Sequence, residues 1–182
     1  MSVKLKQVFS GKRLDEVHAL YETAFPASEK KPFSMIVSGQ GTGLVEILSL
    51  EENNRFLGLA IMAKAGDRVL LDYFAIADEV RGHGAGSAAL QALRERYQGM
   101  RIIKCEDEEE LALRTRRKKF YLRNGFTMLP YYIDLWGTEM EMLSNGQPCP
   151  YEEYLDIYTT AFGTKVSDKI HFLGDAPAAD EI

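Results

Sequence analysis

Apolar and polar residues alternate along this chain in two periods, and each change of period marks the start of another element. Residues 3–9 alternate with a period of two, which predicts a strand. Residues 14–24 repeat at helical spacing, and Phe25 should end that helix because the residue before a proline avoids the α region. A polar connection over 27–32 and a short helix over 33–37 are expected next.

The remaining pattern predicts strands and helices in an order that defines the fold class. Strands are expected over 44–50, 56–63, 69–76, 101–105, 126–134 and 138–143, and helices over 87–97, 109–124 and 151–162. The order β-α-α-β-β-β-α-β-α-β-β with a helical appendage predicts an α+β fold, with a mixed central β-sheet and helices on both faces. We expect one domain over 1–182, with a core of about 3–143 and a C-terminal helical extension and acidic tail over 144–182.

Composition and charge exclude several classes of function. The 182 residues are 46% hydrophobic, which is enough for one domain with a sizeable core. Their net charge of −5 argues against nucleic-acid binding, which needs a basic surface. The first ten residues carry no apolar leader, and eighteen apolar residues never run together, so we expect a cytoplasmic protein that does not enter a membrane.

Metal and disulfide chemistry find no support in the residue pattern. Cys105 and Cys149 lie in very different settings, and His18, His83 and His171 are isolated from one another. Such spacing supplies no metal site, no disulfide framework and no histidine-based triad. We therefore expect no metal cofactor.

The strand-loop-helix over 69–94 is the most informative segment. Its apolar strand leads to the loop 81–86, which reads Arg-Gly-His-Gly-Ala-Gly. Glycines at alternate positions permit positive φ and close approach of a ligand, and N–H groups converge there at a helix N-terminus that favours anions. A pyrophosphate suits this nest. The alternative is a flexible loop without a ligand, because glycine motifs alone are weak signals.

The same glycines are similar to a dinucleotide-binding fingerprint, but their place in the chain argues against that interpretation. The fingerprint belongs after the first strand of a βαβ unit, whereas this loop follows the fourth strand. The acidic residue expected to contact a ribose is also missing from its usual place, where Glu106 comes closest.

Two motifs occur in order with a strand between them. The loop 81–86 has the pattern Arg-x-x-Gly-x-Gly, and residues 120–126 read Phe-Tyr-Leu-Arg-Asn-Gly-Phe. Together with the strand 71–76, they resemble the phosphate-loop signature, the tyrosine segment and the fourth strand of the GNAT superfamily of acyl-CoA N-acyltransferases. The resemblance covers about 3–143 and implies a GNAT-like fold with acetyl-CoA as co-substrate.

The resemblance also implies which residues hold the cofactor. Backbone N–H groups from Gly82 to Ser87 would bind the CoA pyrophosphate. The fourth strand would splay from the fifth at a bulge around 74–76, and the pantetheine arm would add along it there. The residues so implied are Phe74, Ala75, Ile76, Arg81, Gly82, His83, Gly84, Ala85, Gly86 and Ser87.

Tyr121 matches the family tyrosine that protonates the departing CoA thiolate or hydrogen-bonds to its sulfur. Helical spacing places Arg114, Arg117 and Tyr121 on one broad face. A core tyrosine with a satisfied hydroxyl is the alternative. The chain departs from the family at Arg114, where many members carry an asparagine that contacts pantetheine. The basic cluster 114–119 could steer CoA, or it could be a solvated face paired with the acidic run 106–110.

A base is useful because an alkylamine has a pKa of about 10 and must attack without its extra proton. Asp72 lies in the strand that leads to the thioester, and Glu106 ends the neighbouring strand. We favour Glu106 slightly. Either carboxylate could instead be an ordinary surface group.

Aromatic and acidic residues are expected to form the acceptor pocket, since they suit an organic cation. They come from the first two helices and from the strands at 126–143: Phe25, Glu29, Phe33, Tyr131, Tyr132, Asp134, Trp136, Glu139 and Glu141. Ordinary core and hairpin roles are equally compatible with these residues.

The sequence therefore predicts an N-acetyltransferase that moves an acetyl group to a primary amine by direct attack in a ternary complex. The acceptor is expected to be a small molecule, neither nucleic acid nor membrane is expected as a partner, and a homodimer is left open. One alternative is a non-catalytic acyl-CoA-binding module, and a more distant one is a nucleotide-binding protein that uses the same nest.

Overall fold

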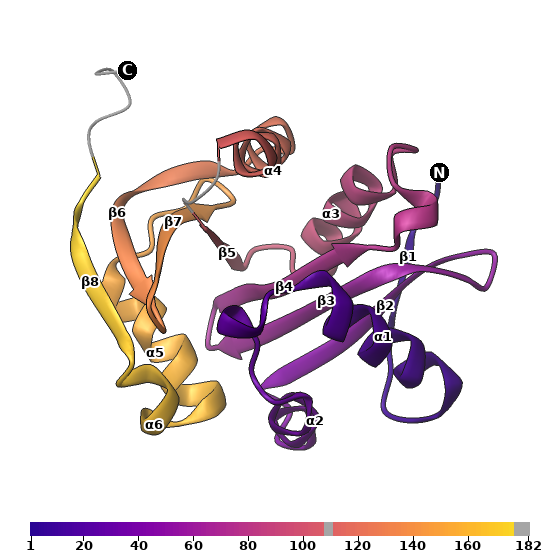
Figure 1. Cartoon of the computed structure of the whole chain (residues 1–182), viewed down its shortest axis with the longest axis horizontal. Helices are drawn as coiled ribbons and strands as arrows, with labels where there is room; N and C mark the ends of the chain where they lie inside the picture. The colour runs from indigo at the N-terminus through magenta and orange to yellow at the C-terminus, as the bar shows by residue number, and fades with distance from the viewer. Residues whose placement is uncertain (108–110, 177–182) are drawn as a thin grey trace.

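Eight strands form one mixed sheet in the order β1-β2-β3-β4-β5-β7-β6-β8 (Figure 1). The structure is a computed structural model that describes residues 1–107 and 111–176, with the backbone alone for 105–107 and 111–115. The strands are β1 (Lys4–Gln7), β2 (Val45–Glu52), β3 (Arg55–Ala65), β4 (Arg68–Ile76), β5 (Arg101–Asp107), β6 (Thr127–Leu135), β7 (Thr138–Ser144) and β8 (Ile170–Asp175).

Helices cover both faces of this sheet, which confirms the predicted fold class. One face carries α3 (Ala85–Arg96) and α4 (Leu111–Arg123), whose apolar residues pack on β2, β3 and β4. The other face carries α1 (Gly11–Ala24), α2 (Phe33–Gly41) and α5 (Tyr151–Phe162). Shorter turns are η1 (Ala27–Glu29), η2 (Asp78–Val80) and α6 (Thr164–Ser167).

A β-bulge in β4 changes which side chains face each layer. In the antiparallel ladder with β3, Leu71 pairs with Met62 and Tyr73 pairs with Ile61, so Asp72 is one residue too many. Before the bulge Leu71 faces α3 and α4, and after it Phe74 faces them as well. Asp72 and Tyr73 both contact the opposite layer, although they are consecutive.

The same strand separates from β5 soon after the two begin to pair. Their parallel ladder runs only from the pair Arg68–Arg101 to the pair Leu70–Ile103. The bulge therefore lies just beyond the point of separation. The sequence placed it at 74–76, so its predicted position was late by a few residues.

Close packing holds the far end of β4 against β3. A Cβ atom on Gly58 would lie 2.2 Å from the carbonyl oxygen of Ala75, closer than real atoms approach. Only glycine lets the two backbones meet at this point, so Gly58 keeps the end of β4 in register before the glycine loop.

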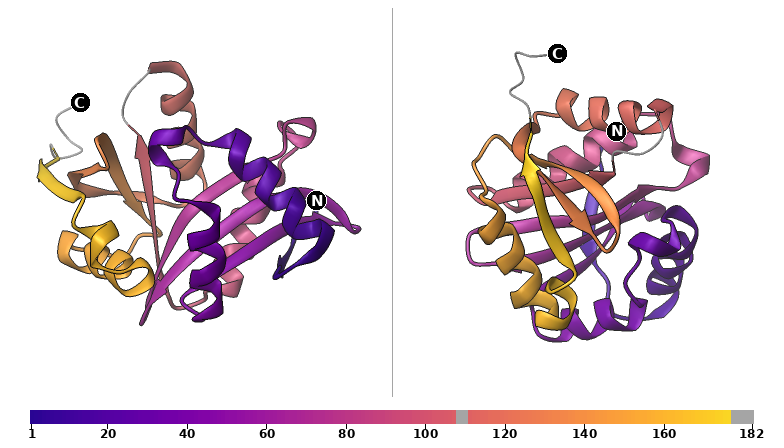
Figure 2. Two further views of the ribbon diagram at one scale, coloured as in Figure 1. Left: turned by 60° about the horizontal axis from the view of Figure 1, so that its bottom comes forward. Right: turned by 60° about the vertical axis from the view of Figure 1, so that its left-hand side comes forward.

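The C-terminal extension adds more than the predicted helix. α5 has the predicted bounds, but the chain then turns through α6 and returns as β8, which pairs antiparallel with β6 (Figure 2). We did not predict this strand, since only a helix and an acidic tail were expected in the extension. The part of the predicted acidic tail beyond 176 lies outside the described residues.

Candidate active site

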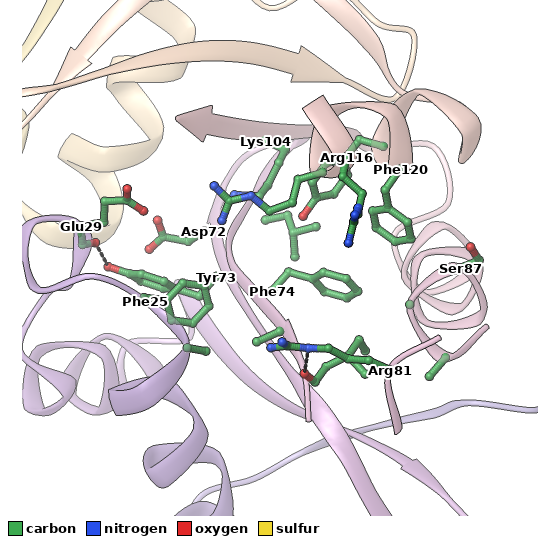
Figure 3. Close-up of a pocket in the computed structure, with 18 of the residues that line it drawn as sticks. Phe25, Glu29, Asp72, Tyr73, Phe74, Arg81, Ser87, Lys104, Arg116 and Phe120 are labelled. Carbon is green, nitrogen blue, oxygen red and sulfur yellow. Dashed lines mark hydrogen bonds between the residues drawn. The ribbon is translucent and has the colours of Figure 1, made fainter. Parts of the chain in front are cut away.

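A cavity of about 910 Å³ opens where β4 and β5 separate. Its walls come from β4, β5, α3, α4, α5 and the α1–α2 connection, by which we mean residues 25–32. Figure 3 shows Phe74 in the middle of this cavity, with Ser87 toward α3 on one side and Asp72 and Glu29 on the other. We call the side near Ser87 the α3 end of the cavity, and the side near Asp72 and Glu29 the acceptor end.

The glycine loop, residues 81–86, forms the α3 end. Gly84 is the N-cap residue of α3 and has φ 83°, and Gly82 has φ 79°, values that favour glycine. A Cβ on either residue would meet no protein atom within 4 Å, so the space beside this backbone is open to a ligand. Backbone N–H groups at the start of a helix face such a ligand, and the helix dipole favours an anion there.

The residues predicted to hold the cofactor come together here, with one exception. Nine of them line the cavity: Phe74, Ala75, Ile76, Arg81, Gly82, Gly84, Ala85, Gly86 and Ser87. His83 does not line it, because its exposed ring turns back to the carbonyl oxygen of Arg81 at 2.9 Å. Arg81 in turn donates from Nε to the carbonyl oxygen of Ile76 at 3.0 Å, which ties the loop to the end of β4.

Basic side chains line this cavity although the chain as a whole is acidic. Described residues that contribute a positive charge are Arg81, Lys104, Arg116, Arg117 and Arg123. Clefts lined by one sign of charge concentrate ligands of the other sign. The lining and the open glycine loop therefore fit the phosphates of CoA, whose adenosine diphosphate part is strongly anionic.

Tyr121 lies in the same cavity, near the end of α4. Its side chain is only 3% exposed and packs between the rings of Phe120 and Phe126, with centroids 5.2 and 5.5 Å away. The ammonium of Lys104 lies 6.0 Å from the centre of the Tyr121 ring. Arg117 lines the cavity too, as the predicted helix face requires, whereas the side chain of Arg114 lies outside the described residues.

Asp72 dominates the acceptor end. Its Oδ2 lies 2.6 Å from Nζ of Lys31, an ion pair without the alignment of a hydrogen bond. The hydroxyl of Tyr158 donates to Oδ1 of Asp72 at 2.7 Å. Both members of the ion pair are buried, with side chains 3% exposed for Lys31 and 5% for Asp72. The predicted base is thus held by two partners that the sequence did not reveal.

An aromatic cage surrounds the Lys31 ammonium. Nζ lies 4.7 Å from the ring centres of Tyr73 and Phe162 and 4.9 Å from those of Trp136 and Tyr158. Ring faces attract a cation at these distances, the more so when water is excluded. The cage draws on β4, the β6–β7 turn and α5, so it exists only once the C-terminal extension has packed on the sheet.

Hydrogen bonds fix the backbone of the α1–α2 connection independently of that ammonium. The Tyr73 hydroxyl donates to the carbonyl oxygen of Glu29 at 2.8 Å and accepts from the backbone N–H of Lys31 at 3.0 Å. Tyr21 donates to the carbonyl oxygen of Lys31 at 2.6 Å. Burial raises the pKa of Tyr21 to about 12, and burial with the nearby Asp72 charge raises the pKa of Tyr73 further. Both hydroxyls therefore keep their protons at neutral pH.

The other predicted acceptor residues divide between the cavity and purely structural contacts. Phe25 and Glu29 line the cavity, and Trp136 belongs to the cage. Phe33 stacks on His18, and Tyr131 donates to the carbonyl oxygen of Cys149 at 2.8 Å. In the β6–β7 ladder Tyr132 pairs with Glu141 and Asp134 pairs with Glu139. Glu141 also forms an ion pair with Lys118 at 2.7 Å.

Glu106, the other predicted base, pairs with Glu141 in the β5–β7 ladder. Its side chain lies outside the described residues, as does the acidic run that was expected to pair with the basic cluster. Within the part of the chain that is described, no group of three or more histidine, cysteine, aspartate or glutamate residues could hold a metal ion. No helix among the described residues is long and apolar enough to cross a membrane.

A family model described as an acetyltransferase (GNAT) domain matches residues 44–128. No curated protein sequence matches the chain. Among solved structures, a Bacteroides thetaiotaomicron protein assigned to the GNAT acetyltransferases is similar with a TM-score of 0.77 at 18% identity, covering 88% of this chain and 99% of that one.

Two further structures carry CoA or a CoA analogue. An aminoglycoside 6'-N-acetyltransferase complexed with coenzyme A has a TM-score of 0.63 at 11% identity, over 81% of this chain and 99% of its own. Arabidopsis thaliana Naa50 in complex with the bisubstrate analogue CoA-Ac-MVNAL has a TM-score of 0.57 at 18% identity, over 81% of this chain and 100% of its own. At these identities the likeness shows the fold.

The fold, with β4 and β5 separated and a glycine loop before α3, matches that of GNAT acyltransferases. Residues 44–128 match an acetyltransferase (GNAT) domain, and this domain indicates an acyltransferase. Both motifs that suggested this family line one cavity.

Removing one partner of the buried ion pair should cost far more stability than removing both. Asp72→Asn leaves the Lys31 ammonium buried without a carboxylate, and breaking a buried pair in this way costs about 3–5 kcal/mol. Lys31→Met should cost a similar amount. The double variant buries no charge, so we expect it to recover most of the loss in a urea denaturation series.

A matched control is Glu22→Gln, which breaks the surface pair between Glu22 and Lys30 and should change little. Single-variant losses that simply add in the double variant would contradict the coupling between Asp72 and Lys31.

Proposed function

We propose that this chain is an N-acetyltransferase that moves the acetyl group of acetyl-CoA to a primary amine by direct attack in a ternary complex. One observation carries the proposal: a single cavity joins the glycine loop before α3 to Tyr121 and to the carboxylate of Asp72. An anion nest, a proton donor and a proton acceptor are the groups that acyl transfer from CoA to an amine requires. Because β8 continues the same sheet, we further propose that 1–182 acts as one domain.

Binding is the task of the α3 end. Backbone N–H groups from Gly84 to Ser87 would hold the pyrophosphate, and the basic lining would attract it. Beyond Leu70 the edge of β4 leaves its ladder with β5, so its backbone groups can bond to the pantetheine arm as to an added strand. When bound, acetyl-CoA supplies the acyl group as a thioester.

Side chains in the middle of the cavity and at its acceptor end would transfer the protons. Tyr121 would hold a proton for the thiolate that leaves, and Asp72 or Glu106 would accept one from the amine. Burial raises the pKa of the Cys149 thiol to about 11, so this thiol is a poor nucleophile, in keeping with direct attack.

We propose a small amine as the acceptor. The α1–α2 connection, Leu135, Met140 and Tyr158 wall this end of the cavity. The similar structures include one enzyme named for an aminoglycoside and one complex with a peptide-like analogue. A panel of primary amines, assayed for thiol release from acetyl-CoA with mass spectrometry of the product, tests the proposal. Binding of acetyl-CoA without thiol release by any amine would favour the non-catalytic alternative.

Acetyl-CoA should stabilise the chain through the glycine loop. At a concentration 100 times its Kd a ligand adds about 2.7 kcal/mol of stability, or about 5–10 °C in Tm for a chain of this size. Gly84→Val adds a branched side chain beside the open space, so we expect this shift to disappear in thermal melts.

Valine is also strained at positive φ, so the control must carry the same strain elsewhere. Gly146→Val suits, because Gly146 has φ 94°, open space around its Cβ and a place outside the cavity. It should melt lower than the unaltered chain yet keep the full acetyl-CoA shift. An undiminished shift in Gly84→Val would remove the phosphate-loop assignment.

Tyr121→Phe removes one hydroxyl and keeps the ring contacts with Phe120 and Phe126. General acid catalysis contributes about 10²–10⁴-fold, so we expect single-turnover acetyl transfer to slow by that order with an unchanged acetyl-CoA shift in Tm. Single-turnover rates exclude product release as the limiting step. A rate near that of the unaltered chain would leave Tyr121 as a structural residue.

A further inference from the structure

Lys31 fills a site that has the composition of a receptor for an organic ammonium ion. Four aromatic rings lie 4.7–4.9 Å from its Nζ, and the carboxylate of Asp72 lies 2.6 Å away. Aromatic cages of this kind recognise ammonium ligands in other proteins, because ring faces and a carboxylate together replace the water that the cation loses. Here the ligand is the chain's own side chain.

The cage adjoins the acceptor end of the cavity. Asp72, Tyr73 and Tyr158 line the cavity and also contact the Lys31 ammonium. In Figure 3, Asp72 and Tyr73 lie at the acceptor end, across from Phe74 and Arg81. These three residues therefore lie between the caged ammonium and the cavity, where they could contact a ligand on either side.

Stability alone does not explain a lysine in this place. A buried ion pair is often no more stabilising than apolar residues of the same shape, so folding does not require the charge. The backbone of Lys31 is held by Tyr73 and Tyr21 through bonds that do not involve Nζ. The side chain can thus leave the cage while the α1–α2 connection stays anchored to β4 and α1.

We propose that the cage is the binding site for the ammonium group of the acceptor amine, and that Lys31 is a tethered stand-in that occupies it until the acceptor enters. This inference rests on the proposed function and names the acceptor class as a primary ammonium on an unbranched carbon. When one ammonium replaces the other, Asp72 keeps a cationic partner, so the exchange leaves no buried charge uncompensated.

The replacement of the Lys31 ammonium by that of the acceptor also identifies Asp72 as the base. The acceptor ammonium gives its first proton to Asp72, which passes it to solvent. The amine nitrogen then forms the bond to the acetyl carbon as the carbon–sulfur bond breaks. Nitrogen loses a second proton to Asp72 in that step, and Tyr121 gives one to the departing thiolate. The proton on Asp72 then returns through solvent to the Tyr121 phenolate, so that the products are the amide, CoA thiol and one proton in solution.

Emptying the cage tests the proposal, with n-propylamine as the probe. Lys31→Ala keeps Cβ, so n-propylammonium replaces the missing three carbons and the nitrogen. We expect Lys31→Ala to lose stability and n-propylammonium to restore about half or more of the lost Tm by binding the native state, whereas 1-propanol does not.

The same variant should acetylate n-propylamine with a kcat/KM at least about 10-fold above that of the unaltered chain, because a tethered competitor has been removed. Lys12→Ala is the control: Lys12 is exposed on α1 and lies outside the cavity. Both its Tm and its kcat/KM should equal those of the unaltered chain.

Restored stability with unchanged kcat/KM would overturn the proposal and leave the cage as a structural device. So would a folded Lys31→Ala that n-propylammonium does not stabilise. If the unaltered chain and its variants bind acetyl-CoA but none releases thiol, the proposed function fails. The Tm measurements with n-propylammonium still test the cage in that case.

A measurement on the unaltered chain decides the matter should Lys31→Ala not fold. N-hydroxysuccinimidyl acetate labels accessible lysines, and it should label the exposed Lys12 quickly and the buried Lys31 slowly. Tetramethylammonium suits an aromatic cage and does not consume the reagent. At equal ionic strength to sodium chloride, it should speed labelling of Lys31 and not of Lys12. Equal Lys31 labelling in the two salts would refute the exchange.

Discussion

The brief parallel ladder between β4 and β5 is the constraint on which the rest of the site depends. Three residue pairs hold the two strands together, and beyond Leu70 they part. A sheet that loses a ladder exposes backbone donors and acceptors, which are costly when buried without partners. Here the loss opens a cavity that the loop before α3 and the side chain of Tyr121 both reach.

The bulge at Asp72 lies just beyond that point of separation. Because the extra residue interrupts the alternation, Asp72 and Tyr73 both contact the layer formed by α1, α2 and α5. The two side chains then meet Lys31 from the α1–α2 connection and Tyr158 from the C-terminal extension. One backbone irregularity therefore joins the two halves of the chain at the acceptor end.

Local motifs made the α3 end predictable from the sequence. The glycine loop and the segment around Tyr121 depend on φ values and helix ends, which neighbouring residues determine. The acceptor end was only partly predictable. Asp72, Phe25 and Glu29 were expected there, but Lys31, Tyr158 and Phe162 were not, because a one-residue bulge and the docking of α5 bring them together. β8 was not predicted, because the alternation of apolar and polar residues is weak in an edge strand after a short turn.

The central claim is that the cavity between β4 and β5 binds acetyl-CoA with its phosphates on the glycine loop and its thioester toward Tyr121. A crystal structure of the chain with acetyl-CoA measures this directly. We expect pyrophosphate oxygens within hydrogen-bonding distance of the backbone N–H groups from Gly84 to Ser87, and the sulfur facing the Tyr121 hydroxyl. A ligand bound elsewhere, or phosphates on the loop with the thioester turned away from Tyr121 and Asp72, would contradict the account.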